Sequence, residues 1–215
     1  MMGVDDQPDR PLRSLRHEFA RAQGKLGHSG HPVDLVAVVL VDGECRDDER
    51  GRSITCYGAL HVRMVDGDPA FSSHHVSTGR PADRLRILRR LADLCDGRNV
   101  VLGSPDAHET FWDRRHVLRA GVGFLDAMVG FKGNRPSDLS LVGTPEAAMI
   151  ELASGFGLPN CYETDIMRQA RCADVRAQLV WLAYVVSKAG RKEARELFAA
   201  FRAWKALENA RPLPF

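Results

Sequence analysis

The pattern of apolar and polar positions divides the chain into an unpatterned start and a long patterned region. Residues 1–32 are mostly polar and charged, and we expect them to form an N-terminal arm; the alternative is one short amphipathic helix that includes Leu12, Leu15, Phe19 and Ala20. Positions 33–41 are almost continuously apolar and rich in β-branched residues, which predicts a strand buried on both faces. Positions 54–65 and 71–77, separated by the turn sequence Asp66-Gly67-Asp68, predict a hairpin beside that strand.

Helical spacing begins after the hairpin. Pro81 suits a first helical turn, leucines recur at helical intervals from Leu85 to Leu94, and Gly97 ends the run, which predicts a helix over 81–97. Beyond it, the pattern predicts a strand over 99–102, a helix from about 107 to 119, a short strand over 123–129, and helices over 145–156, 166–188 and 192–209. This order predicts an α/β fold with a mixed sheet flanked by helices.

Composition sets broad limits on the class of protein. A length of 215 residues and a hydrophobic fraction of 44% suit one domain, which we expect over 33–190, followed by a C-terminal helix and tail over 191–215. The formal net charge of +2 neither requires nor excludes a nucleic-acid partner, and it does not fix the oligomeric state. The five cysteines form no Cys-x-x-Cys pair, and no apolar run approaches the roughly 20 residues that span a bilayer. We therefore expect a soluble, cytoplasmic protein with reduced thiols and no membrane partner.

Two acidic residues stand where the first buried strand ends. Asp42 and Glu44 are two positions apart, so both would lie on one face if the strand continues. Two neighbouring carboxylates repel each other and are usually stabilised by a cation, and Mg²⁺ or Mn²⁺ prefers such oxygen ligands. The alternative interpretation is a polar turn that closes the strand, because Asp-Gly is a common turn dipeptide.

Two further acids follow later elements. Asp106 comes after the short strand over 99–102, and binding sites in α/β folds lie beyond the carboxyl ends of strands. Its alternative role is that of an N-cap for the next helix. Asp174 lies one residue from the apolar stripe of a late helix, a mildly unfavourable place unless the carboxylate is used; a solvated helix position is the alternative.

Together the four acids resemble the pattern of the DEDD 3′–5′ exonucleases, which are ribonuclease-H-like proteins. The resemblance covers about residues 33–186. Within this family, the chain resembles the branch close to the exonuclease domains of family B DNA polymerases. The segments that carry it, besides the acids, are Phe124-Leu-Asp-Ala-Met, Glu151-Leu-Ala-Ser-Gly-Phe-Gly-Leu-Pro159 and Cys172-Ala-Asp174-Val175.

The resemblance implies a ribonuclease-H-like sheet and a two-metal hydrolysis of phosphodiester bonds. Asp42, Glu44, Asp106 and Asp174 would be the catalytic residues and the ligands of two Mg²⁺ or Mn²⁺ ions about 4 Å apart. The substrate would be the 3′ end of single-stranded DNA or RNA, held through its phosphates.

The sequence departs from the family in two places. Where the family has a Tyr or a His shortly before the last Asp, this chain has Ala170 and Gln169, and neither is a competent general base. Tyr162 in the preceding loop is a possible substitute, although an ordinary half-buried tyrosine is the simpler interpretation. The residues before Asp106 are Gly-Ser-Pro, where the family more often has Asn-Gly and an aromatic residue.

Three hypotheses therefore stay open. The first is an active metal-dependent exonuclease. The second is a catalytically weak or inactive exonuclease-like module that binds nucleic acid or a protein. The third is an unrelated α/β domain in which the four acids never converge.

Other polar groups have simpler interpretations. His74-His75 and His108-Glu109 lack zinc-ligand spacing and are interpreted as surface residues. Arg114-Arg115 and His116 are interpreted as a solvated helix face, with phosphate contacts as the alternative. In the last helix, an aromatic stripe predicts core or a dimer contact, and the basic residues between are either a solvated face or a nucleic-acid rim. The stripe is Leu197, Phe198, Phe201, Trp204 and Leu207, and the basic residues are Arg191, Lys192, Arg195, Arg202 and Lys205.

Overall fold

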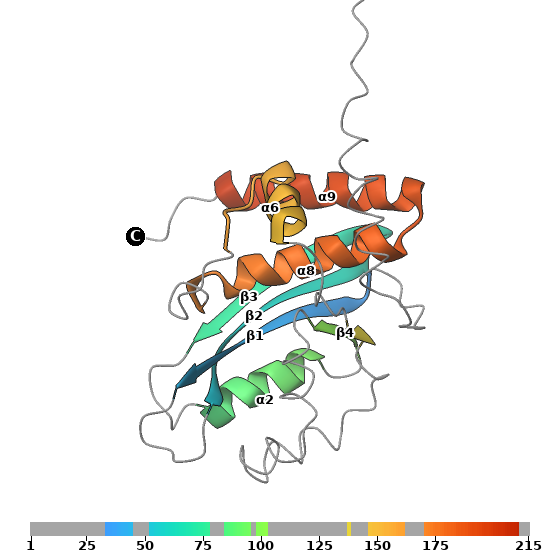
Figure 1. The fold of residues 1–215 in the computed structure, drawn as a ribbon. Coiled ribbons are helices and arrows are strands. Elements are labelled where there is room, and N and C mark those ends of the chain that lie inside the picture. The colour runs from blue at the N-terminus through green and yellow to red at the C-terminus, as the bar shows by residue number, and fades with distance from the viewer. Residues whose placement is uncertain are drawn as a thin grey trace, which may run out of the picture.

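The fold is that of a computed structural model, which describes residues 33–44, 52–77, 84–95, 98–102, 137–138, 146–161 and 170–210 (Figure 1). The elements in these ranges are β1 (Leu35–Glu44), β2 (Arg52–Val65), β3 (Asp68–Ser77), α2 (Arg84–Cys95), β4 (Asn99–Leu102), β5 (Ser137–Asp138), α6 (Glu146–Gly155), α8 (Ala173–Lys188) and α9 (Arg191–Ala210).

One mixed sheet organises the described residues. Its strand order is β3-β2-β1-β4-β5. The pairs β1–β2 and β2–β3 are antiparallel, whereas β1–β4 and β4–β5 are parallel. Helices cover both faces, α8 on one side and α2 on the other (Figure 1). The prediction of an α/β fold with a mixed sheet flanked by helices is confirmed at this level.

The predicted hairpin is formed by β2 and β3. Asp66 and Gly67 have φ values of 53° and 90°, and two consecutive positive φ values are typical of the tight turn that matches the twist of antiparallel strands. Strand β3 begins at Asp68, earlier than the predicted 71. Pro69 is tolerated there because β3 is an edge strand of the described sheet.

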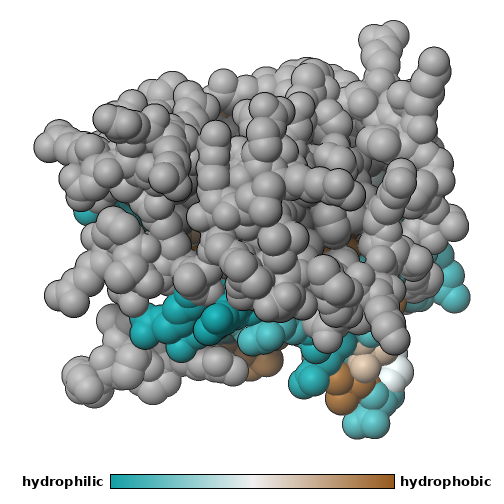
Figure 2. Space-filling model, turned by 90° about the horizontal axis from the view of Figure 1, so that it is seen from below, coloured by the Kyte–Doolittle hydropathy of each residue, from teal (hydrophilic) through white to brown (hydrophobic). Residues whose placement is uncertain are grey.

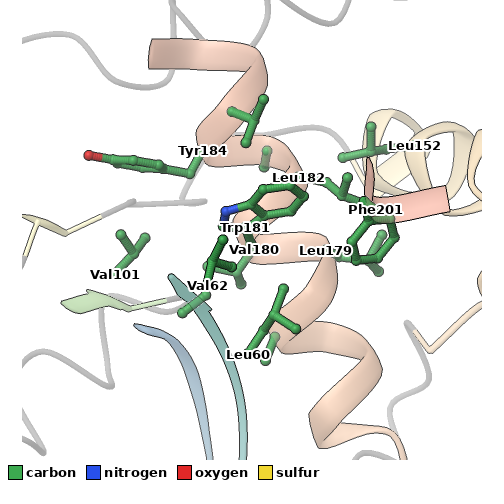
Figure 3. Close-up of a cluster of buried hydrophobic side chains, with 14 of the residues drawn as sticks. Leu60, Val62, Val101, Leu152, Leu179, Val180, Trp181, Leu182, Tyr184 and Phe201 are labelled. Carbon is green, nitrogen blue, oxygen red and sulfur yellow. The ribbon is translucent and has the colours of Figure 1, made fainter. Parts of the chain in front are cut away.

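The larger core lies between the sheet and α8. Alternate residues of β1, including Leu35, Ala37 and Val39, pack there with α8, and α6 and α9 complete the layer. Figure 3 shows Trp181 beside Phe201 in this cluster. Their rings are stacked at 5.4 Å between centroids, and each is fully buried. The aromatic stripe of the last helix is thus core at Leu197, Phe198 and Phe201, while Leu207 is 68% exposed.

The opposite face of the sheet carries a smaller core under α2. Val36 and Val38 of β1 pack there against Ile87 and Leu91, so β1 is apolar on both faces as predicted. The outer side of α2 is exposed, with arginines at 86, 89 and 90. Figure 2 views the molecule from the side of α2, and the described residues visible there are mostly hydrophilic.

Helix boundaries agree with the sequence in most places. The helices expected over 81–97, 145–156 and 192–209 correspond to α2, α6 and α9. The prediction of one helix over 166–188 is wrong at Cys172, where the backbone has φ −106° and ψ 11° and a new helix, α8, begins at Ala173. The interruption has no sequence signal, because neither Pro nor Gly stands there. The short strand β5 was not predicted.

Several predicted elements lie outside the described residues: the arm over 1–32, the helix over 107–119 and the strand over 123–129. Among the helices that the structure describes, none combines the length and the apolar character needed to cross a bilayer.

Candidate functional site

The first two candidate acids belong to the sheet itself. Strand β1 continues through Asp42 to Glu44, with Asp42 paired to Ile54 and Glu44 paired to Arg52. The alternative of a polar turn at Asp42-Gly43 is therefore wrong. The side chains of both acids lie outside the part of the chain that the structure describes.

An irregularity in pairing directly precedes these acids. Val41 pairs with Cys56 and Asp42 pairs with Ile54, so Thr55 is an extra residue on β2. A β-bulge of this kind bends the strands and increases their twist, and bulges are over-represented beside active sites. The change of register therefore falls between the buried part of β1 and its acidic end.

The next candidate acid follows β4. Strands β1 and β4 run parallel, with Val38 paired to Leu102, so their carboxyl ends point to the same edge of the sheet. Asp42 and Asp106 follow this pair by the same number of residues along the chain. Asp106 itself lies outside the described residues, and its proximity to Asp42 stays a prediction.

Asp174 occupies the first turn of α8 and is the candidate acid whose surroundings are described. Helix α8 begins directly over β2 at Gly58, where an added Cβ would overlap the backbone of Ala173 and the amide nitrogen of Asp174. Only glycine allows this close approach. The short side chain of Asp174 is thereby held just above the sheet.

His75 of β3 meets Asp174 across this contact. The two atoms that approach are His75 Nδ1 and Asp174 Oδ1, at 3.4 Å, and their side chains are 32% and 30% exposed. On its other side, His75 Nε2 lies 3.7 Å from Cys56 Sγ. Cys56 Sγ also lies 3.4 Å from the carbonyl oxygen of Ala170. A thiol, an imidazole and a carboxylate thus follow one another from β2 through β3 to α8.

The polar contacts between α8 and β3 continue one helical turn further. Gln178, which is 1% exposed, donates from Nε2 to Ser73 Oγ at 3.3 Å. Its Oε1 has no hydrogen-bond partner among the described residues. Asp174 and Gln178 share one helix face, just as Ser73 and His75 share one strand face. The α8–β3 contact therefore contains a polar strip within an otherwise apolar layer.

The order of groups resembles a cysteine–histidine–aspartate triad, but the thiol is unsuited to nucleophilic attack. Cys56 is 1% exposed. Burial, and then the negative charge of Asp174, raises the pKa of its thiol to about 11. Reactive cysteines need the opposite, an accessible thiol with a lowered pKa. Cys56 therefore acts here as a protonated, buried neighbour of the imidazole.

Two more thiols surround the start of α8. Burial, followed by a hydrogen bond to Cys172, raises the pKa of Cys161 to about 12.

Within the described part of the chain, no group of three or more His, Cys, Asp or Glu side chains is arranged to hold a metal ion. The side chains of Asp42, Glu44 and Asp106 do not belong to that part.

His75 and Cys56 were missed as site residues in the sequence. His75 was interpreted as a surface residue, and it is exposed, but its imidazole also contacts Asp174 and Cys56. His74 faces the opposite side of β3, where its Nε2 lies 3.2 Å from Ser72 Oγ. The hairpin register provided the signal, since it sets His75 opposite Gly58 and on the same face as Cys56.

Some of the other residues singled out in the sequence are described by the structure, and others lie outside the described residues. Ala170 is partly buried against the larger core, and its carbonyl faces the Cys56 thiol. In the last helix, the guanidinium of Arg202 lies 4.6 Å from the ring centre of Phe156, and Lys205 Nζ lies 5.5 Å from that of Trp204. Outside the described residues lie Tyr162, Gln169, His108-Glu109, Arg114-Arg115 and His116.

Comparison with known proteins adds no relative. No family model, no curated protein and no solved structure matches this chain.

Proposed function

We propose that this protein is a metal-dependent 3′–5′ exonuclease with a ribonuclease-H-like fold that acts on single-stranded ends. The observation that carries the proposal is the arrangement of the sheet. Strand β1, which includes Asp42 and Glu44, runs parallel to β4, and α8 brings Asp174 against the same sheet. A mixed sheet with helices on both faces is also the architecture that the resemblance implies.

Asp42, Glu44, Asp106 and Asp174 would hold the metal ions. Their chemistry fits, because Mg²⁺ and Mn²⁺ prefer carboxylate oxygens. When bound, such ions supply an activated water and stabilise the leaving oxygen of a phosphodiester. A site shared by Asp42 and Asp174 would have to span the distance between these two residues. Asp174 lies over Gly58, which pairs with Val39, and Asp42 is roughly 10 Å further along β1 at about 3.3 Å per residue.

The chain's own residues would also have to hold the carboxylates and the substrate in place. Asp174 is fixed by the close contact at Gly58 and by His75, so one end of the carboxylate set is held by the fold. The substrate's phosphates need cations, but the exposed Arg191, Lys192 and Arg195 begin α9 beyond the far end of α8, roughly 20 Å from Asp174 at about 1.5 Å per residue. Lys192 is also 3.9 Å from Glu196, which reduces the positive charge of this face.

A direct assay tests the proposal. End-labelled single-stranded DNA and RNA are incubated with the protein and Mn²⁺, and the products are resolved by length. We expect stepwise shortening from the 3′ end by the wild type and loss of shortening in Asp42→Ala. Asp68→Ala is the matched control, since Asp68 is an exposed acid at the hairpin turn. No Mn²⁺-dependent shortening by the wild type would refute the exonuclease.

A second candidate function is an exonuclease-like module that binds without cleaving. The observation that favours it is Ala170, whose methyl group stands at a position where the family carries a Tyr and which offers no group to orient or deprotonate water. The same assay separates the two candidates. Retention of the oligonucleotide in a gel-shift experiment with Mn²⁺, without any shortening, would favour the binding module.

A further inference from the structure

We propose that His75 is a positioning residue that orients the Asp174 carboxylate toward a divalent cation. The inference rests on the proposed function, because it assigns Asp174 to the cation site. It differs from the family pattern in its source, since the imidazole comes from strand β3 and not from the helix that carries the last Asp. His75 itself need not touch the ion.

The contact engages one carboxylate oxygen, Oδ1, across 3.4 Å. Asp174 Oδ1 is the atom that His75 approaches, and Oδ2 has no hydrogen-bond partner among the described residues. An ionised carboxylate only accepts hydrogen bonds. A hydrogen bond to an ionised Asp174 therefore requires the form of His75 that carries a proton on Nδ1.

The imidazole is itself held in place from behind. Cys56 Sγ is 3.7 Å from Nε2, and the same sulfur lies 3.4 Å from the Ala170 carbonyl. The thiol carries one proton, so it donates either to the carbonyl or to Nε2, and in both cases the sulfur stays against the ring. Because Cys56 is buried in the core, the ring has a rigid support.

Outer partners of this kind matter for metal sites. Groups that hydrogen-bond to a metal ligand fix its orientation, and their loss typically costs about 10- to 100-fold in metal affinity. Gly58 and His75 both position Asp174. Gly58 lets the backbone of Asp174 approach the sheet, and His75 orients the carboxylate.

Two substitutions separate the role of Nδ1 from the bulk of the ring. In His75→Asn, the side-chain amide nitrogen stands near the position of Nδ1 and can still donate to Asp174. In His75→Gln, the amide reaches toward the position of Nε2, so the donor to Asp174 is lost. His74→Gln is the matched control, because His74 faces the other side of β3 and contacts Ser72.

The experiment is a Mn²⁺ titration of the full chain, read as the decrease of the free-ion signal in electron paramagnetic resonance. We expect His75→Gln to weaken Mn²⁺ binding by about 10- to 100-fold. His75→Asn and His74→Gln should bind close to the wild type. Circular dichroism and thermal unfolding of each variant show that the compared proteins are folded; if His75→Gln does not fold, the loss is measured in Cys56→Ala, which removes the support of the ring.

Each outcome decides the inference separately from the exonuclease. Weaker Mn²⁺ binding by His75→Gln with rescue by His75→Asn supports it even if no nucleic acid is shortened. Equal binding by wild type and His75→Gln overturns it, even if the wild type is an active exonuclease. A wild type that binds no Mn²⁺, or equal losses in both His75 variants, also overturns it.

Discussion

The contact between Gly58 and α8 makes a quantitative prediction. A Cβ at residue 58 would overlap the carbonyl carbon and oxygen of Ala173 and the amide nitrogen of Asp174. All three are backbone atoms of a helix whose next residues are buried in the core, so no side-chain rotation can relieve the overlap. In Gly58→Ala, the start of α8 must therefore move away from β2.

We expect this displacement to lower the free energy of unfolding by about 3 kcal/mol, at the upper end of the range for overpacking. Smaller losses occur where a flexible side chain can move, and here none is involved. The displacement also separates Asp174 from His75, whose present distance of 3.4 Å is already long for a hydrogen bond between nitrogen and oxygen. The same variant should therefore lose Mn²⁺ affinity.

Urea unfolding followed by circular dichroism measures the change, with Gly155→Ala as control. Gly155 is the last residue of α6, and a Cβ there meets no atom within 4 Å. Because alanine is the better helix former and restricts the unfolded chain, we expect Gly155→Ala to be neutral or to stabilise by up to about 1 kcal/mol. Equal stability of Gly58→Ala and wild type would show that the close approach of α8 to β2 is wrong.

The remaining predictions concern the core and pH. Phe201→Ala should lower the free energy of unfolding by about 3–5 kcal/mol in urea unfolding, because the ring is fully buried; a loss below 1 kcal/mol would contradict its central position. Burial raises the pKa of Cys56 to about 11 and of Cys95 to about 12, so both thiols should resist iodoacetamide at pH 8 until urea is added, as read by mass spectrometry of the peptides. Since these pKa values lie above the ordinary 9.0, the linked stability is complete below pH 9 and falls as pH rises through 11 to 12. Burial lowers the pKa of His61 and His74 from 6.5, so their contribution is present above pH 6.5 and falls in acid; urea titrations at pH 5 and 7 should show lower stability at pH 5.

The sequence predicted those elements whose signals are local. The hairpin follows from Asp66-Gly67, where the positive φ values that the turn needs are easily adopted. Helix α2 follows from the spacing of its leucines, and β1 follows from a run of apolar residues that two helical layers bury. Each of these signals is complete within a dozen or so residues, which is why it can be recognised without a partner segment.

The parts that failed depend on distant segments. The break at Cys172 places α8 on β2, and the residue that permits this, Gly58, lies on another strand. Strand β5 comprises two residues, Ser137 and Asp138, which gain strand geometry from pairing with β4 and not from an apolar pattern. The position of His75 likewise depends on the hairpin register and on α8 together. None of these could be derived from one window of sequence.

An acid at position 174 can be explained by the stability of the helix or by a function, and the groups around Asp174 bear on this choice. An acid in the first turn of a helix is stabilised by the free N–H groups and the helix dipole, and this applies to Asp174 because Cys172 makes no side-chain cap hydrogen bond. That explanation accounts for the carboxylate but not for the histidine behind it. Burying the polar Cys56 thiol against the partly exposed His75 imidazole costs more than packing two apolar side chains of similar size there. The ordering of Cys56, His75 and Asp174 is therefore the feature that helix capping leaves unexplained, and the proposed role of His75 beside a cation site would account for it.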